Sequence, residues 1–217
     1  MAKKEIKIVE IHPLNVGHLS IKLVGDSPLW IRRLSAKFKD EIEGRNKGKA
    51  LPKKKIRDKD EEFRESLYWL DKDSNEIAAG KDVSKHNYWG FPASGFKKAA
   101  ISACRAFQGI KMTEMKGAFH VLGRYVRIEG KPQVQKEQDC DGIWVREGGK
   151  GPGTGIPNVR YRAEFPVWSA VLNVRYNKNM ISPEQIYNLM NTAGFAVGVG
   201  EDRPDKAGGQ GGMFHVE

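Results

Sequence analysis

Two stretches of the chain have residues suited to binding anions. One is rich in basic side chains, and the other is rich in glycine, whose backbone carries no side chain. Residues 45–57 contain seven basic residues and no acidic one, which makes this window the most basic of the sequence. Gly48 and Pro52 disfavour a long regular element there. A solvated loop would account for the window, and the alternative is a thumb that wraps a phosphate backbone. The predicted contacts of such a thumb are Lys53, Lys54, Lys55 and Arg57.

The second stretch is rich in glycine and runs from Gly198 to Phe214. Backbone without Cβ atoms can approach a phosphate or a base closely, and consecutive N–H groups can form a concavity that binds anions. Arg203 and Lys206 lie within this segment. It matches neither of the glycine patterns that bind nucleotides. A flexible loop is the alternative, although a two-residue turn would suffice between the helix and the final strand that flank it.

Catalytic chemistry is not predicted. The five histidines are scattered over predicted strands and loops, and no paired carboxylates or catalytic spacing accompanies them. Asp139 and Asp141 flank Cys140, but one short acidic loop is weak support for a metal site. Cys104 falls on the apolar stripe of a predicted helix and is expected to pack as a small hydrophobic residue. We therefore expect no enzyme activity, no metal and no cofactor.

The charge of the chain indicates its partner. The 217 residues carry a formal net charge of +10 with a pI near 9.5, and excess positive charge attracts polyanions. Nucleic acid is the expected partner, and a basic protein without a specific partner is the alternative. A membrane is not expected, because no stretch reaches the roughly 20 apolar residues needed to cross one. Two cysteines and a start without the apolar segment of a secretory signal favour the cytoplasm.

The length fits one domain, residues 1–217, that contains one sizeable insertion. Alternation of β-branched and apolar residues predicts strands at 4–11 and 18–24. The charge then rises sharply, and residues 32–88 are predicted to be a basic insertion. Its flanks, which are expected to be helical, are residues 34–43 and 59–70.

The clearest helix is predicted over residues 95–107. Its apolar residues recur at the spacing of one helical face, with Ser94 placed to cap the helix and Gly109 placed to end it. The residues of this stripe are Phe96, Ala99, Ala100, Ala103, Cys104 and Phe107.

The second half of the chain opens with predicted strands at 118–121 and 124–129. Residues 130–160 are expected to form a loop, because a run of glycines cannot hold a regular structure cheaply. A long alternating strand is predicted at 166–176, with Trp168 on its core face.

A second helix is predicted to begin at Ser182, where Pro183 and Gln185 complete a capping box, and to end at Gly194. Residues Met213–Val216 form a closing strand. The order of elements is typical of an α+β, ferredoxin-like fold of the βαββαβ type, with the basic insertion between its first strand and first helix. Helices cover one face of the antiparallel sheet in this fold, and its RRM-like members bind RNA.

Three motifs resemble the RAMP superfamily, the ferredoxin-like proteins of CRISPR ribonucleoproteins. The sequence Phe91-Pro-Ala-Ser-Gly-Phe-Lys-Lys-Ala-Ala100 is similar to a helix start of that superfamily, and Gly198–Phe214 resembles its C-terminal glycine-rich loop. Gly25-Asp-Ser-Pro-Leu29 is similar to its T/S-P-L motif. Together the motifs span about 190 residues in the expected order. The whole chain also resembles phage and prophage proteins.

Within the superfamily, the chain looks most like the backbone subunit that polymerises along a guide RNA, with residues 32–88 as its thumb. The resemblance implies sequence-independent binding of single-stranded nucleic acid, with RNA slightly favoured over DNA. It also implies self-association into a helical filament or ring. The alternatives are a phage protein that coats or anneals single-stranded DNA, a guide-processing ribonuclease, and a virion or assembly protein whose charge only aids solubility.

The resemblance also implies where the nucleic acid binds. We expect the glycine-rich segment to meet the start of the helix at 95–107 in an exposed cationic groove. The predicted contacts there are Lys97, Lys98, Arg105, Gly200, Arg203, Lys206, Gly208 and Gly209. Base stacking on aromatic rings contributes about 1–3 kcal/mol per base, and the candidate rings are Trp30, Tyr88, Trp89 and Phe91. Any one lysine or arginine taken alone is more often a solvated surface residue.

Overall fold

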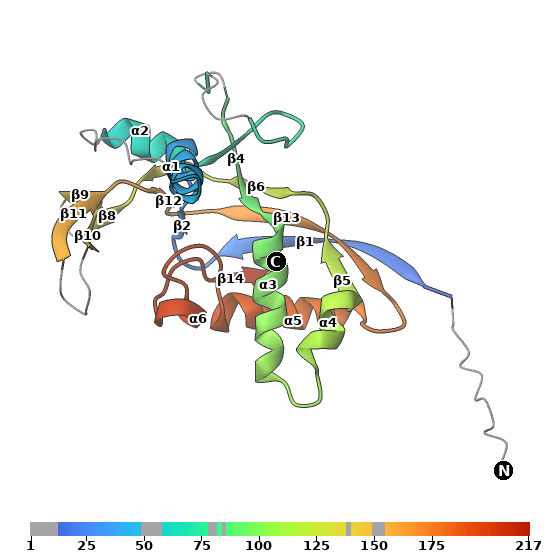
Figure 1. The fold of residues 1–217 in the computed structure, drawn as a ribbon. Helices are drawn as coiled ribbons and strands as arrows, with labels where there is room; N and C mark the ends of the chain where they lie inside the picture. The colour runs from blue at the N-terminus through green and yellow to red at the C-terminus, as the bar shows by residue number, and fades with distance from the viewer. Residues whose placement is uncertain (1–12, 49–57, 78–81, 84–85, 138–139, 149–154) are drawn as a thin grey trace, which may run out of the picture.

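The computed structural model of the chain describes residues 13–48, 58–77, 82–83, 86–137, 140–148 and 155–217. The described residues form a mixed α+β fold built on antiparallel sheets (Figure 1), which confirms the predicted fold class at this level. The strand predicted at 4–11 and the thumb contacts Lys53, Lys54, Lys55 and Arg57 lie outside the described residues.

Seven strands form the central sheet, in the order β14-β1-β13-β6-β4-β3, with β5 pairing beside β13. Its two long strands are β1 (Val16–Gly25) and β13 (Ser169–Asn177), which pair with each other antiparallel. The shorter strands are β3 (Tyr68–Leu70), β4 (Tyr88–Pro92), β5 (Phe119–Val121), β6 (Tyr125–Glu129) and β14 (Phe214–Val216). These bounds confirm the strands that were predicted at 18–24, 118–121, 124–129, 166–176 and 213–216.

Alternating side chains give this sheet two different faces. In β1, Ile21 and Leu23 are buried, whereas Lys22 between them is exposed. β13 alternates in step, because its buried Leu172 lies directly opposite Ile21 and its exposed Val171 opposite Lys22. One face of the long strands is therefore core and the other faces solvent, as antiparallel sheets allow.

Helices pack against the core face. Figure 1 shows them on the same side of the long strands. Phe96 lies within this layer, and its ring centroid is 6.1 Å from that of Phe214 on the edge strand β14. The helices of this layer are α3 (Ala93–Ala103), which continues into the 3₁₀ turn η1 (Cys104–Ala106), α4 (Met112–Ala118) and α5 (Pro183–Ala196).

The predicted apolar stripe of α3 is confirmed, but its predicted cap is wrong. Ser94 lies inside the first turn, because the helix already begins at Ala93. Strand β4 runs directly into the helix, so Pro92 occupies the N-cap position and no side chain caps it. The N–H of Ala93 instead donates to the carbonyl of Arg124 at 3.0 Å. The next helix, α4, was not predicted.

The predicted start of α5 is confirmed and its predicted end is wrong. Ser182 Oγ accepts from the N–H of Gln185, whose side chain accepts from the N–H of Ser182, as a capping box requires. Gly194 lies within the helix rather than after it. It packs against the carbonyl of Phe214, which a Cβ at this position would overlap. The chain turns at Gly198, whose φ is +69°.

The predicted insertion contributes to the sheets as well as to helices. Helices α1 (Ala36–Asn46) and α2 (Lys59–Ser66) lie in its predicted helical flanks. The second flank was predicted to stay helical to residue 70, but Tyr68–Leu70 is strand β3, because a Tyr-Trp-Leu run favours a pleated sheet. Strand β2 (Leu29–Ile31) precedes the insertion. The insertion is thus joined to the central sheet through β3.

The loop predicted over residues 130–160 is wrong for the part of this range that the structure describes, and residues 138–139 and 149–154 lie outside the described residues. Strand-forming residues flank the glycine run, and the two flanks pair with each other from Ile143 opposite Arg160 to Gly148 opposite Gly155. A separate three-stranded sheet has the order β2-β12-β7. The strands of this region are β7 (Gln133–Val134), β8 (Lys136–Glu137), β9 (Cys140–Asp141), β10 (Ile143–Gly148), β11 (Gly155–Arg160) and β12 (Ala163–Phe165).

A polar network ties the insertion to the central sheet. Arg33, which follows β2, forms an ion pair with Glu76 at 3.0 Å, and the hydroxyl of Tyr125 on β6 donates to Glu76 at 2.6 Å. Burial opposes the ionisation of Glu76, but the Tyr125 hydrogen bond and the charge of Arg33 outweigh it and hold the pKa of Glu76 below its usual value. Burial, followed by the hydrogen bond with Glu76, raises the pKa of Tyr125 to about 12.

This network predicts how the stability of the protein depends on pH. A carboxylate with a lowered pKa stabilises the fold above its unfolded pKa of about 4.3 and loses that effect as the pH falls through its folded pKa. A tyrosine with a raised pKa stabilises the fold below pH 10 and loses that effect toward pH 12. The free energies of unfolding in urea of wild type and Glu76→Gln should therefore differ most between about pH 4.3 and about pH 10. The difference should shrink as the pH falls below this range. If the difference in the free energy of unfolding stayed constant down to about pH 2.5, the lowered pKa of Glu76 would not be the source of the effect.

Candidate nucleic-acid interface

The glycine-rich segment is a packed loop fixed against the turn between β1 and β2. The N–H of Glu201 donates to the carbonyl of Trp30 at 3.0 Å, and the N–H of Gly212 donates to the carbonyl of Pro28 at 2.8 Å. Ser27 Oγ accepts from the N–H of Met213 at 2.9 Å. Two of the three motifs that suggested the superfamily are therefore in direct contact. These contacts favour a fixed loop over the flexible one considered from sequence.

The glycines of this loop allow close approach to the protein's own backbone. A Cβ at Gly200 would lie 2.5 Å from the carbonyl oxygen of Trp30, and one at Gly211 would lie 2.7 Å from that of Glu201. A Cβ at Gly209 would overlap the carbonyl of Asp202. Chain packing thus accounts for these glycines, and contact with a phosphate is not needed to explain them. Gly208 differs, because it ends helix α6 (Pro204–Ala207) with a φ of +65° and has open space around it.

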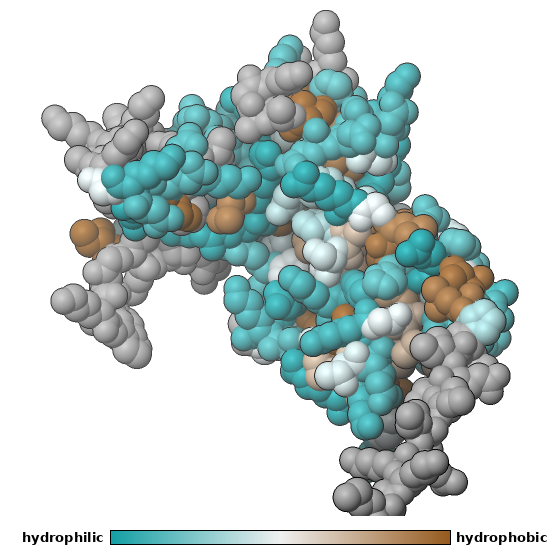
Figure 2. Space-filling view, turned by 45° about the vertical axis from the view of Figure 1, so that its right-hand side comes forward, coloured by the Kyte–Doolittle hydropathy of each residue, from teal (hydrophilic) through white to brown (hydrophobic). Residues whose placement is uncertain are grey.

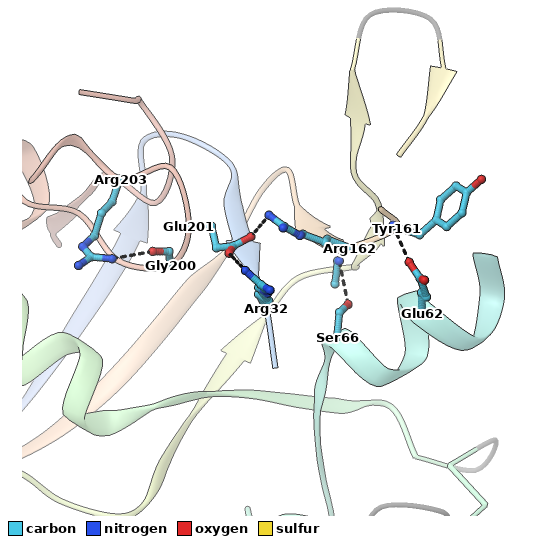
Figure 3. A network of polar contacts seen from close by, with 9 residues as sticks. Arg32, Glu62, Ser66, Tyr161, Arg162, Gly200, Glu201 and Arg203 are labelled. Carbon is cyan, nitrogen blue, oxygen red and sulfur yellow. Dashed lines mark hydrogen bonds and ion pairs between the residues drawn. The ribbon is translucent and has the colours of Figure 1, made fainter. Parts of the chain in front are cut away.

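A network of arginines lies where this loop meets the β2-β12-β7 sheet (Figure 3). Arg162, which precedes β12, forms an ion pair with Glu201 of the loop. Arg32, which follows β2, approaches the other oxygen of the same carboxylate, with its Nη1 3.6 Å from Oε1. The Arg162 and Glu201 side chains are only 13% and 19% exposed, whereas that of Arg32 is 42% exposed. Arg32 is therefore the member of the network that a ligand can reach.

The network carries more positive than negative charge. Burial lowers the pKa of Arg162 first, and the neighbouring charges of Arg32 and Arg160 lower it further, while Glu201 acts in the opposite direction. The Glu201 carboxylate thus serves the guanidinium groups of Arg32 and Arg162, which also repel each other. An anion placed beside Arg32 would relieve this repulsion, and a guanidinium can contact a phosphate through two parallel hydrogen bonds.

Helix α2 holds residues 161–163, which lead from β11 into β12 and include Arg162. Ser66 Oγ accepts from the N–H of Ala163 at 2.9 Å, and Glu62 accepts from the N–H of Tyr161 at 3.2 Å (Figure 3). The carbonyl of Arg162 accepts from the N–H of Gln135 at 2.8 Å. The backbone at Arg162 is therefore fixed on both sides, which holds its guanidinium in place against Glu201.

The predicted contacts of the first helix are separated by the structure. Arg105 of η1 forms an ion pair with Asp205 of α6 at 3.1 Å, so the glycine-rich segment does meet this helix. They also meet at the start of the helix, where Phe214, the last residue of the segment, packs against Phe96 of the first turn. The cationic groove expected there stays a prediction. Lys97 extends to another edge, where its Nζ donates to the carbonyl of Lys116 at 2.9 Å. Lys98 is exposed.

The remaining predicted contacts lie in the loop and in the core layer. Arg203 Nη1 donates to the carbonyl of Gly200 at 3.1 Å, and Lys206 is exposed on α6. Trp89 contacts Phe165 at 6.0 Å between ring centroids, and Phe91 contacts Phe96 at 5.5 Å. Both rings are only partly buried, but these contacts favour packing over base stacking for them.

Sequence reasoning missed Arg32, Arg160 and Arg162. Two of the motifs could have pointed to these residues. Arg32 closely follows the Gly25–Leu29 motif, and Glu201 lies within Gly198–Phe214. Arg160 and Arg162 fell within or beside the residues that were expected to form a loop. The pairing of Arg162 with Glu201, 39 positions away, cannot be read from local spacing.

A cleft of about 830 Å³ lies elsewhere, between the insertion and the β5–β6 turn. Its charged side chains are mixed, with more acidic than basic groups, so it suits a polyanion poorly. Those lining residues are Arg33, Lys39, Arg124, Asp40, Glu43, Asp73 and Glu76. Figure 2 shows a surface that is mostly hydrophilic in that view, with separate hydrophobic patches.

Comparison with known proteins adds no relative: no family model and no curated protein matches the chain. Across the part of the chain that the structure describes, the helices are too short or too polar to span a bilayer. The same residues contain no group of three or more histidine, cysteine, aspartate or glutamate side chains placed to hold a metal ion.

Proposed function

We propose that the protein binds single-stranded nucleic acid through its phosphate backbone, without strong sequence preference and in several copies along the strand. The observation that carries this proposal is the arginine network around Glu201, where one carboxylate is shared by the guanidinium groups of Arg32 and Arg162. The net charge of +10 supplies the long-range attraction. RNA is slightly favoured over DNA because the motifs resemble those of RNA-binding RAMP proteins.

The order of the strands supports the finer fold assignment. Reading β1, α3, β6, β13, α5 and β14 as the βαββαβ unit gives the sheet order β14-β1-β13-β6. In this order the first and third strands are central and the last strand pairs with the first, as in a ferredoxin-like sheet. Strands β4 and β3 then extend the sheet beside β6, and the smaller sheets are additions to that unit.

Within this proposal, phosphates contact the exposed side of the network. Arg32, which follows β2, is the exposed arginine of the network, and Lys206 of α6 is an exposed cation in the same glycine-rich segment as Glu201. Arg162 is a positioning residue, because its guanidinium is largely buried and holds Glu201 in place. Since base edges are not needed for such contacts, binding is expected to depend little on sequence.

Binding of labelled strands tests the proposal. Fluorescence anisotropy at low salt should show that a single-stranded RNA binds the protein, that the same sequence as single-stranded DNA binds slightly less tightly, and that the duplex binds least. Failure to bind any strand at low salt would overturn the proposal. Tighter binding of DNA would favour the strand-coating alternative, and cleavage of the RNA during incubation would favour the ribonuclease.

A further inference from the structure

The solvent face of the central sheet carries a row of basic side chains at the end away from the arginine network. His18 of β1 lies directly opposite Arg175 of β13, and Arg175 lies directly opposite His120 of β5. All three are exposed. Side chains opposite one another in an antiparallel pair have Cβ atoms about 5 Å apart. The register therefore places three groups that can carry positive charge in one line across three strands.

Lys97 joins this row from α3. Its Nζ lies 3.0 Å from Nδ1 of His120, as well as donating to the carbonyl of Lys116. An ammonium group can only donate, so Nδ1 of His120 accepts and the proton of the neutral ring lies on Nε2. Among the described residues, the Nε2–H of His120 has no hydrogen-bond acceptor, so it can donate to a ligand.

No carboxylate balances this row within the described residues. Among them, Lys97, Arg175 and His18 form no ion pair with an acidic side chain. The groups that face His120 are the Lys97 ammonium from α3, the Lys116 carbonyl from α4 and the Arg175 guanidinium from β13. Burial, then Lys97 and Arg175, lower the pKa of His120, and burial lowers the pKa of Lys97.

We infer that Lys97, His120 and Arg175, with His18 beside them, form a binding site for a phosphate group. The guanidinium, the ammonium and the His120 Nε2–H supply three kinds of donor to one anion. The phosphate belongs either to a nucleic-acid strand, in which case the inference rests on the proposed function, or to a free phosphate ion. The row lies near the Val16–Asn177 end of the β1–β13 pair, and the arginine network lies near the Gly25 end.

The site is expected to respond to pH. Without an anion, a proton added to His120 meets the positive charges of Lys97 and Arg175, so protonation is unfavourable. A bound phosphate reverses that balance and raises the pKa of His120. Because the bound state takes up a proton more readily, a strand phosphate, whose single negative charge does not change in this range, should bind more tightly as the pH falls through the pKa of His120 in the bound state.

An NMR titration of the histidine rings tests this inference. Inorganic phosphate, added against chloride at matched ionic strength, should raise the pKa of His120 by about one unit. The Arg175→Gln variant should abolish that rise, whereas Lys72→Gln, which removes an exposed positive charge from the insertion, should preserve it. The His120 resonance is assigned from its loss in His120→Gln. No change in its pKa with phosphate and with a single-stranded RNA would overturn the inference.

The two arms of the titration separate this inference from the proposed function. If the pKa of His120 rises with inorganic phosphate and the protein binds no strand, the site is one for free phosphate and nucleic-acid binding is rejected. A rise with both ligands would place a strand on the sheet face. A strand that binds without moving the pKa of His120, while phosphate does move it, would restrict the site to the free ion.

Discussion

Replacing Gly194 by alanine is expected to lower the free energy of unfolding by about 3 kcal/mol, because the new Cβ would overlap the carbonyl of Phe214. The direction is the reverse of the usual effect, since alanine inside a helix is ordinarily about 1 kcal/mol better than glycine. Helix α5 and the edge strand β14 must separate to accept the methyl group. Differential scanning calorimetry should show a loss in Tm of about 6–12 °C.

Gly117→Ala is the matched control. Gly117 also lies inside a helix, α4, but a Cβ there would meet nothing within 4 Å. This variant should gain about 0.5–1 kcal/mol from helix propensity alone. If both variants gained stability, close contact between α5 and β14 would not be the reason for glycine at position 194.

Arg32→Gln is expected to weaken binding of single-stranded RNA about tenfold, because a hydrogen bond to a charged group contributes roughly 1.5–3 kcal/mol. The fold should be nearly unaffected. The Arg32 side chain is 42% exposed and its ion pair with Glu201 is long at 3.6 Å, and exposed pairs contribute little stability. Anisotropy titrations give the affinity, and a thermal melt of the same sample checks the fold.

Lys178→Gln removes the same charge elsewhere. Lys178 is exposed and follows β13 at the opposite end of the sheet from Arg32. Its loss should reduce affinity only through the net charge, by less than the loss of Arg32. Equal losses in the two variants would mean that the network has no special role and that charge alone governs binding.

The strands and helices that could be predicted from sequence are those whose pattern is local. Alternation in β1 and β13 marked the core face, and the capping box at Ser182 marked the start of α5. The end of α5 was missed because Gly194 is required by contact with Phe214, twenty positions later in the chain. A helix that ends at glycine and a helix that uses glycine for close packing look alike in sequence.

In the candidate site too, contacts between residues distant in the sequence could not be predicted. The glycine-rich segment was correctly singled out, but its bare backbone approaches Trp30 and Asp202 of the protein itself. The arginine network was missed because its partners come from three distant parts of the chain. Sequence spacing shows which residues share an element, whereas the pairing of β2 with β12 decides which elements meet.

The salt dependence of RNA binding tests the central claim most directly. On a single strand, log affinity should fall with log salt at a slope of about −0.7 for each phosphate contact. We expect a steep slope for the wild-type protein and a slope shallower by about 0.7 for Arg32→Gln, with Lys178→Gln close to wild type. Identical slopes for wild type and Arg32→Gln, or affinity that does not depend on salt, would contradict a phosphate contact at the arginine network.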